Sequence, residues 1–267
     1  MQPARIVLLT GGSSGIGAAA ALLLARSGMT VYAASRSGRA PEHPGIIPVV
    51  MDVNDDAAVA RTVEKIVAEQ GRLDAVVCNA GNGIAGAVED TSVDEARYQF
   101  ETCFFGAVRT VGACLPVFRR QGFGRILTIS SVAAVIPIPY QTFYSSVKAA
   151  LLMYTRALSL EVRPFGVQCC SILPGDTKTG FTGARKYVEK AYDGAYAERM
   201  ARSVAKMEKD EQNGMSPDVI ARAILRQLRR RNMRPHVTPR LDYKAFEILS
   251  RILPARLVLR IVGLLYA

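Results

Sequence analysis

The chain has 267 residues, of which 49% are hydrophobic and 21% are charged. This length accommodates one large domain or two small ones, and the composition excludes a disordered or collagen-like chain. The net charge is +11, and the stretch from Pro217 to the C-terminus supplies +8 of it, with eleven Arg or Lys against three acids. Such a chain attracts polyanions, but it has no nucleic-acid-binding motif, so we expect no nucleic-acid partner. No uncharged apolar run reaches the roughly 18 residues of a membrane-spanning helix.

The cysteines lie in apolar stretches without regular spacing, and their number is odd. They are Cys78, Cys103, Cys114, Cys169 and Cys170. This pattern argues against a disulfide framework, and no Cys or His spacing indicates a metal site. We therefore expect buried free thiols, a reducing compartment and a cytoplasmic location. The apolar residues 18–25 follow a glycine-rich stretch, unlike those of a signal peptide, so we expect the N-terminus to be part of the fold.

Short apolar strands alternate with helices along the chain. Strands are predicted at 5–9, 30–34, 46–50, 73–78, 124–129 and 167–173, with a last short strand at 234–237. Helices are predicted at 16–27, 55–70, 93–120, 141–163 and 217–231, and Pro116 is expected to kink or end the third. This alternation predicts an α/β fold, a single-domain doubly wound parallel sheet (Rossmann fold) with a helical C-terminal extension. Ligands bind such sheets at the carboxyl ends of the strands.

We predict that residues 1–240 form one dinucleotide-binding and catalytic domain, and that 241–267 form a basic amphipathic C-terminal segment. Within the domain, residues 176–215 are predicted to be a substrate-loop insertion of helical character over the binding edge. Two interpretations of its apolar side chains remain open, a pocket wall or ordinary helix packing. These side chains are Phe181, Tyr187, Tyr192, Tyr196, Met200 and Met207. The uncharged residues 135–139 are expected to lie beside the substrate, which favours a hydrophobic one.

The stretch from Thr10 to Gly17 is rich in glycine and lies between the first strand and the first helix. Glycines permit a tight turn and a close approach of backbone to ligand. The N-terminus of the helix then offers free N–H groups and a positive dipole to a pyrophosphate. We predict a phosphate-binding loop, because its position between a strand and a helix favours this over a structural turn.

Arg36 follows the second strand, and no acid lies between Gly28 and Pro41. In dinucleotide-binding folds a carboxylate near this point holds the adenosine ribose, whereas an Arg accommodates a 2′-phosphate. A carboxylate would repel that phosphate and an Arg would pair with it. The sequence therefore predicts NADP(H) rather than NAD(H); the alternative is that Arg36 is a solvated surface residue.

Tyr144 and Lys148 are four residues apart on a predicted helix, so they lie on the same face. A cation beside a phenol stabilises the phenolate, which lets a Tyr act as a general acid or base near neutral pH. Of the ten tyrosines, only Tyr144 has a Lys four residues later. Ser131 ends the preceding strand and is placed to bond a substrate oxygen.

Five motifs have the order and spacing of the short-chain dehydrogenase/reductase family, which the chain resembles over roughly residues 4–231. They are Thr10–Gly17, Asn79–Gly81, Ser131, Tyr144 with Lys148, and Pro174–Gly175. Within the family, the residues around Arg36, the segment after Pro174 and the tail are most similar to the group of 17β-hydroxysteroid dehydrogenase type 1 and photoreceptor-type retinol dehydrogenases.

The resemblance implies a role for each catalytic residue. Tyr144 is the general acid or base, Lys148 stabilises its phenolate and bonds the nicotinamide ribose, and Ser131 orients the carbonyl. It also implies cofactor contacts, which together with those argued above are Gly11, Ser13, Ser14, Gly15, Ile16, Gly17, Arg36, Asp52, Val53, Asn79, Ala80, Gly81, Tyr144, Lys148, Pro174, Gly175, Thr177 and Thr179. No metal is expected.

The implied function is an NADP(H)-dependent oxidoreductase that interconverts a hydrophobic ketone or aldehyde and an alcohol, with a steroid-, retinoid- or lipid-like substrate. The alternative is a non-catalytic NADP(H)-binding sensor or scaffold. Family members often pair through two long helices, so a homodimer or homotetramer is expected. One departure is Cys103, which stands where the family usually has an Asn that holds a water linked to Lys148. This substitution puts the proton relay in doubt.

The last 25 residues alternate Leu, Ile and Val with Lys244, Arg251, Arg256 and Arg260. A basic amphipathic helix can lie on an anionic membrane surface. The other interpretation is a tail that packs on the domain or on a partner subunit. Both remain open from the sequence, so peripheral membrane association is an expectation to be tested.

Overall fold

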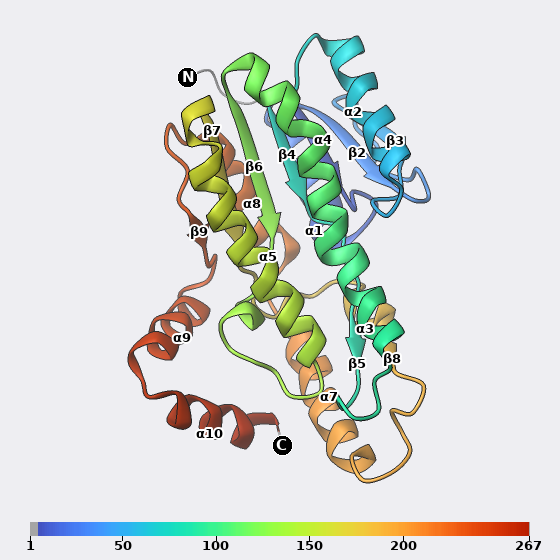
Figure 1. Ribbon diagram of the computed structural model, residues 1–267, viewed down its shortest axis with the longest axis vertical. Helices are drawn as coiled ribbons and strands as arrows, with labels where there is room; N and C mark the ends of the chain where they lie inside the picture. The colour runs from blue at the N-terminus through green and yellow to red at the C-terminus, as the bar shows by residue number, and fades with distance from the viewer. Residues whose placement is uncertain (1–4, 267) are drawn as a thin grey trace.

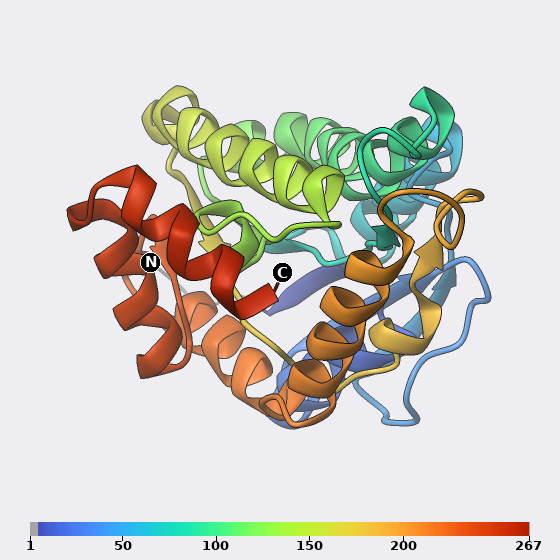
Figure 2. The ribbon, with the colours of Figure 1, turned by 90° about the horizontal axis from the view of Figure 1, so that it is seen from below.

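The computed structural model describes residues 5–266 and contains a parallel seven-stranded sheet between two layers of helices (Figures 1 and 2). The strands lie side by side in the order β3-β2-β1-β4-β6-β7-β9. Their bounds are β1 Ile6–Thr10, β2 Thr30–Ser35, β3 Ile46–Val50, β4 Ala75–Cys78, β6 Gly124–Ile129, β7 Val167–Ile172 and β9 His236–Val237. These strands are short and mostly apolar because helices cover both faces of the sheet. The predicted fold class is confirmed.

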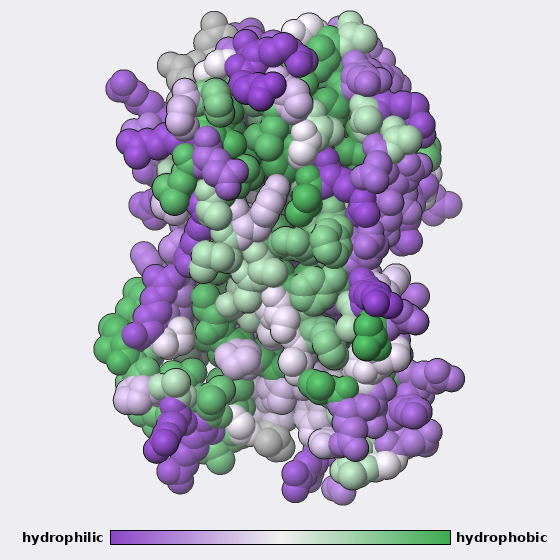
Figure 3. Space-filling view, viewed as in Figure 1, coloured by the Kyte–Doolittle hydropathy of each residue, from purple (hydrophilic) through white to green (hydrophobic). Residues whose placement is uncertain are grey.

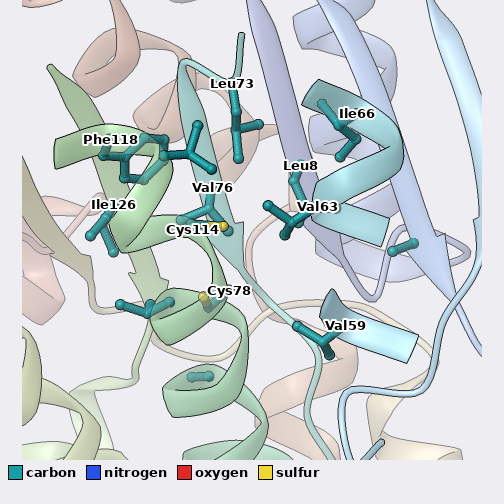
Figure 4. Packing of buried hydrophobic residues seen from close by; sticks show 14 of the residues in the cluster. Leu8, Val59, Val63, Ile66, Leu73, Val76, Cys78, Cys114, Phe118 and Ile126 are labelled. Atoms are coloured by element: carbon teal, nitrogen blue, oxygen red, sulfur yellow. The ribbon is translucent and has the colours of Figure 1, made fainter. Parts of the chain in front are cut away.

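One face of the sheet is covered by α2 (Asp56–Gln70), α4 (Gly106–Gln121) and α5 (Thr142–Glu161), of which α4 and α5 lie in front in Figure 1. Figure 4 shows the core on this face, with side chains of the strands meeting those of α2 and α4. The opposite face is covered by α1 (Gly15–Arg26) and α8 (Pro217–Arg229). The two cores fix the sheet in place, so the loops at its carboxyl edge stand on a rigid support.

The strand order reverses between β1 and β4, which are neighbours in the sheet although β2 and β3 separate them in sequence. Successive strands are parallel and in register, so their carboxyl ends meet at one edge: Thr10 pairs with Ala34, and Cys78 with Thr128. A crevice forms where the connections after β1 and β4 diverge to opposite faces. The loops that follow these two strands therefore flank a binding site.

The predicted helix over 93–120 is interrupted. It begins as α3 (Val93–Phe100), passes through a π-helical turn at Glu101–Phe105 and continues as α4. Pro116 lies inside α4 without ending it, because the buried side chains around it hold the helix against the sheet. The stretch Val93–Gln121 is long and apolar enough to cross a membrane, but the core helix of a protein that does not span one can have the same length and composition.

The segment after β7 contains α6 (Phe181–Ala184), β8 (Lys186–Tyr187) and α7 (Ala197–Gln212). β8 pairs with β5 (Ile84–Ala85) in a second, two-stranded sheet that the sequence analysis did not predict. The buried Arg185 forms an ion pair with Glu211 of α7, which ties the segment together. The remaining short elements are two 3-10 turns, Val132–Ala134 and Arg163–Phe165.

The tail forms two helices, α9 (Leu241–Ile252) and α10 (Ala255–Tyr266), which are separated at Pro254. Glu247 of α9 is 3% exposed and has three partners. Two lie at the end of β9, Thr238 Oγ1 at 2.5 Å and His236 Nε2 at 2.9 Å, and the third is Arg251 Nη2 of α9 itself at 2.6 Å. A buried carboxylate with three partners is costly to disrupt, so α9 is firmly joined to the edge of the sheet. Figure 2 shows α10 running from α9 toward α7 beneath the sheet.

All five cysteines are free and buried, as predicted. Burial raises the pKa of Cys78, Cys169 and Cys170 from 9.0 to about 12, and that of Cys114 well above 9.0. The unfolded chain would release these protons near pH 8.5, so unfolding releases protons between that pH and the folded-state values. The thiols therefore contribute stability below about pH 8.5 that is lost as the pH rises toward 12.

We expect the urea concentration at the midpoint of unfolding to decrease as the pH is raised from about 9 to about 11. Over this range each thiol lowers the free energy of unfolding by up to about 1.4 kcal/mol per pH unit. At pH 8 Ellman's reagent should leave the native protein nearly unmodified, and it should titrate five thiols after denaturation. Fast reaction of several thiols in the native protein would contradict this burial.

Candidate active site

A cavity of about 880 Å³ lies at the carboxyl edge of the sheet. The residues that the sequence analysis assigned to the site line it, with the single exception of Gly17. The register of the parallel strands explains this, because residues scattered from 11 to 179 follow strands whose ends meet at one edge. The structure thus brings the predicted cofactor contacts and the three predicted catalytic residues into one space.

The glycine-rich loop packs against the residues that directly follow β4. Asn79 Nδ2 donates to the carbonyl oxygens of Thr10 and Gly11 at 3.0 and 3.1 Å, and Thr10 Oγ1 accepts from the backbone N–H groups of Asn79 and Ala80 at 3.0 Å. A Cβ on Gly17 would lie 2.0 Å from the Gly11 carbonyl oxygen, so only glycine fits behind the loop. The side chain of Asn79 thus braces the loop, and its predicted contact with a ribose stays a prediction.

Helix α1 begins at the loop with an open N-terminus. The side chain of Ser14, the N-cap residue, forms no capping hydrogen bond, and Gly15 has φ of +53°. The first N–H groups of the helix therefore lack a side-chain cap and lie beside the cavity that Ser13, Ser14 and Ile16 line. This geometry suits an anionic group such as a pyrophosphate.

Arg36 directly follows β2, and its exposed side chain lines the cavity. Within residues 5–266 its guanidinium has no ion pair and no hydrogen bond. Asp52 follows β3 on the same side of the cavity, where its Oδ1 accepts from the Asn54 backbone N–H at 2.9 Å. An unpaired guanidinium at the cavity wall fits a phosphate group, which leaves the predicted role of Arg36 open to test.

Tyr144 and Lys148 lie on the first turns of α5 and face the cavity together. Lys148 is 7% exposed, and its Nζ lies 5.5 Å from the centroid of the Tyr144 ring and donates to the Ile129 carbonyl oxygen at 2.9 Å. The Phe181 ring packs against Tyr144 from the segment after β7, with centroids 5.8 Å apart. The phenol is thus held between a buried cation and an apolar ring.

Ser131 follows β6 and caps the 3-10 turn Val132–Ala134. Its Oγ accepts from the Ala133 N–H at 3.1 Å and lies 3.4 Å from the Pro174 carbonyl oxygen, to which it donates. Thr177 Oγ1 donates to the Gly175 carbonyl oxygen at 2.8 Å. Ser131 and the turn after β7 are therefore positioned by one another at the ends of neighbouring strands.

Cys103 lies in the π-helical turn and is 2% exposed. Its thiol donates to Asn82 Oδ1 at 3.2 Å, and its sulfur accepts from the Asn82 backbone N–H at 3.3 Å. The fully buried Gln99 donates to Asn82 Oδ1 at 3.0 Å and to the Asn82 carbonyl oxygen at 2.8 Å. The Cys thus belongs to a polar cluster with Gln99 and with Asn82, which lines the cavity.

The tail contributes to the site, which was not predicted from the sequence. Tyr243 of α9 donates from its hydroxyl to Asp176 Oδ2 at 2.6 Å, and its ring lies so close to Gly175 that a Cβ there would be 2.4 Å away. Burial raises the pKa of Asp176 above its usual value, although the Tyr243 hydrogen bond opposes this. Seven apolar residues of the tail line the cavity, six on the two helices and Leu253 between them: Phe246, Leu249, Leu253, Val258, Ile261, Val262 and Leu265.

Most of the apolar side chains of segment 176–215 do not form a wall of the cavity, which was one of the two interpretations left open by the sequence. Phe181 lines the cavity, but Tyr187, Tyr192, Tyr196, Met200 and Met207 do not. Met200 and Tyr187 instead pack with Val204 and Val188 in a separate small core. Of residues 135–139, Ile136 and Ile138 line the cavity as expected. The apolar wall therefore comes from residues 136–138, Phe181 and the tail.

Comparisons with known proteins agree with this geometry. A family model described as short chain dehydrogenase matches residues 5–190. A 3-ketodihydrosphingosine reductase of Bacteroides thetaiotaomicron is 42% identical over 234 residues, which cover 87% of this chain and 86% of that protein. The 17-beta-hydroxysteroid dehydrogenase type 1 of Homo sapiens is 35% identical over 191 residues, which cover 67% of this chain and 58% of that protein.

A solved short-chain dehydrogenase from Streptomyces avermitilis superimposes with a TM-score of 0.82 at 30% sequence identity, covering 92% of each chain. Three findings lead to the same assignment. They are the shared fold, the family match over most of the chain, and the similarity to the 3-ketodihydrosphingosine reductase over most of both chains. The chain therefore belongs to the short-chain dehydrogenase family and is an oxidoreductase that acts on CH–OH groups.

Proposed function

We propose that the protein is an NADP(H)-dependent reductase that converts a ketone on a long-chain lipid to the alcohol. The observation that carries this proposal is the continuity of the cavity, which joins the phosphate loop and Arg36 to Tyr144 and to the apolar wall of α9 and α10. The names of two relatives, a 3-ketodihydrosphingosine reductase and a 17-beta-hydroxysteroid dehydrogenase, support a lipophilic substrate. The proposal extends to two copies pairing through α4 and α5, since Met153 and Leu160 of α5 and Phe105, directly before α4, are exposed.

The residues at the cavity fit a dinucleotide phosphate. The open N-terminus of α1 and the glycine-only backbone behind it would hold the pyrophosphate, and the unpaired Arg36 would hold the 2′-phosphate. When bound, NADPH supplies the hydride for the carbonyl carbon. The turn from Pro174 to Thr179 would lie against the cofactor at the ends of β6 and β7.

The chain's own residues handle the oxygen of the substrate. Ser131 Oγ would donate a hydrogen bond to the carbonyl oxygen, which orients it and stabilises developing negative charge. The Tyr144 hydroxyl would donate a proton to the same oxygen, and the buried Lys148 ammonium would stabilise the resulting phenolate. Oxidation of the alcohol would use the same groups in reverse.

The shape of the apolar wall favours a single long chain. Phe246 and Leu249 lie along one side of α9 and Leu253 directly follows that helix, while Val258, Ile261 and Leu265 recur along α10. Each row extends over eight residues, and seven helical steps of about 1.5 Å give a length of about 10 Å. Two such rows would contact an extended alkyl chain along its length, and burial of each methylene is worth about 0.8 kcal/mol.

The test is NADPH oxidation by the full chain with a panel of ketones. We expect turnover of 3-ketodihydrosphingosine dispersed in detergent, and a kcat/KM that falls by roughly tenfold for every two methylenes removed, because each loses about 0.8 kcal/mol. Estrone, a polycyclic ketone, and retinal, an aldehyde that carries one ring, serve as comparisons of a different shape. A higher kcat/KM with either of them, or one independent of chain length, would contradict the single-chain site.

A further inference from the structure

The tail helices expose an unusual amount of apolar surface. In the part of the chain that the structure describes, nineteen large hydrophobic side chains are exposed, and ten of them lie on α9 and α10. Some of these line the cavity, but Leu241, Ile252 and Leu264 do not, and they are 83%, 72% and 80% exposed. Figure 3 shows this hydrophobic surface at the lower left, bordered by hydrophilic residues. Exposed apolar patches of this kind mark interaction surfaces.

Unpaired cations accompany the apolar side chains. Lys244, Arg256 and Arg260 are exposed, and none of them forms an ion pair with another of residues 5–266. Helix α10 contains no acid, and the two acids of α9 are already neutralised, Asp242 by Arg240 and Glu247 by Arg251. The surface is therefore positive as well as apolar, which complements an anionic, partly apolar partner.

The helices are too short to cross a bilayer but long enough to lie on one. Each has 12 residues and is about 18 Å long, against a hydrocarbon core of about 30 Å. On α10, Val262 is buried and Tyr266 lies over Lys206 of α7, with the ammonium 5.7 Å from the ring centroid. This side anchors α10 to the protein, while Leu257 and Leu264 on the other side stay exposed.

We propose that α9 and α10 dock the protein on the surface of an anionic lipid bilayer, with Leu257 and Leu264 inserted among the acyl chains and Arg256 and Arg260 at the headgroups. The same two helices line the cavity, so docking would place its mouth at the bilayer. If the proposed function holds, a lipid ketone would then enter between the helices without passing through water. Exposing each methylene of its chain to water would cost about as much free energy as burying that methylene in the cavity gains.

The test is sedimentation of the full chain with vesicles. We expect binding to phosphatidylcholine vesicles that contain about one-third phosphatidylglycerol, and little binding to pure phosphatidylcholine. Binding should weaken as ionic strength rises from about 0.05 M to about 0.5 M. The double substitution Arg256→Glu with Arg260→Glu should lower the partition coefficient at least tenfold, since each basic residue near such a surface contributes about fivefold. The double substitution Leu257→Ser with Leu264→Ser should lower the partition coefficient by the same factor at low and at high ionic strength.

The matched control is Arg119→Glu with Arg120→Glu, an equal charge change on exposed residues at the far end of α4 (Figure 1). It should bind vesicles like the wild type. Docking by the tail would be overturned if the control pair lost as much vesicle binding as the pair Arg256→Glu with Arg260→Glu. It would also be overturned if the wild type did not sediment with the vesicles. Light scattering addresses the other occupant: if the tail substitutions instead dissociate an oligomer, a second copy covers this surface and the bilayer proposal is wrong. None of these measurements uses turnover, so they stand apart from the proposed function.

Discussion

Replacing Tyr144 by Phe should reduce kcat for ketone reduction by roughly 10³-fold, because general acid catalysis by a positioned side chain contributes about 10²–10⁴. The substitution removes one hydroxyl and keeps the ring that packs on Phe181 and lies near Lys148. NADPH binding, measured by its fluorescence, should change little, and so should the thermal midpoint. A variant that binds cofactor normally but does not turn over would establish Tyr144 as the proton donor.

Tyr140→Phe is the matched control, because it removes a hydroxyl four residues earlier that does not line the cavity. It should retain nearly full activity. A Tyr144→Phe variant that keeps more than about a tenth of the wild-type rate would exclude Tyr144 as the acid. If the wild type binds NADPH but reduces no ketone, Cys103→Asn separates two explanations. Activity gained on restoring the Asn identifies a disabled relay, and its absence favours the non-catalytic sensor.

Replacing Arg36 by Asp should reverse the cofactor preference. A charge-assisted hydrogen bond contributes about 1.5–3 kcal/mol, so its loss should lower kcat/KM for NADPH by roughly 10- to 100-fold. The new carboxylate would also repel the 2′-phosphate, and it could accept hydrogen bonds from the ribose hydroxyls of NADH. We therefore expect kcat/KM for NADH to equal or exceed that for NADPH in the variant, with the same ketone.

Arg39→Asp makes the same charge change three residues later, at an exposed position outside the cavity. It controls for the long-range effect of net charge on a highly anionic cofactor. Its cofactor preference should stay within about twofold of the wild type at physiological ionic strength, since screening weakens distant charges. Similar ratios for the two variants, or a wild type that prefers NADH, would show that Arg36 does not bind the 2′-phosphate.

The sequence predicted most of the site because the site depends on local rules. Thr10, Ser131 and Pro174 end or follow apolar strands, and parallel pairing brings the ends of strands to one edge whatever the connections between them. Tyr144 and Lys148 face the same way because one helical turn separates them. The glycine-rich loop, Ser131 and the pair of Tyr144 and Lys148 are visible without knowledge of tertiary packing, whereas Pro174 and most other cofactor contacts were implied by the resemblance to the family.

The parts that could not be predicted depend on contacts between distant segments. The spacing of Phe246 and Leu249 predicts an apolar face on α9, but it does not show that this face covers the cavity. Conversely, Met200 and Met207 suggested a pocket wall and turned out to pack in the interior. Such patterns identify a face without its partner. The π-helical turn at Glu101–Phe105 likewise leaves no periodic signal, because it inserts a single extra residue into the helix.

The contact of Tyr243 with Gly175 and Asp176 joins the tail to the turn after β7. The family match ends at residue 190, whereas the apolar wall of the cavity comes largely from residues 246–265. Exchange of the tail between relatives would thus alter the substrates accepted without touching Ser131, Tyr144 or Lys148. Such a chimera would need to carry the aromatic ring together with a glycine at position 175, because any larger residue there would push the new tail away from the site.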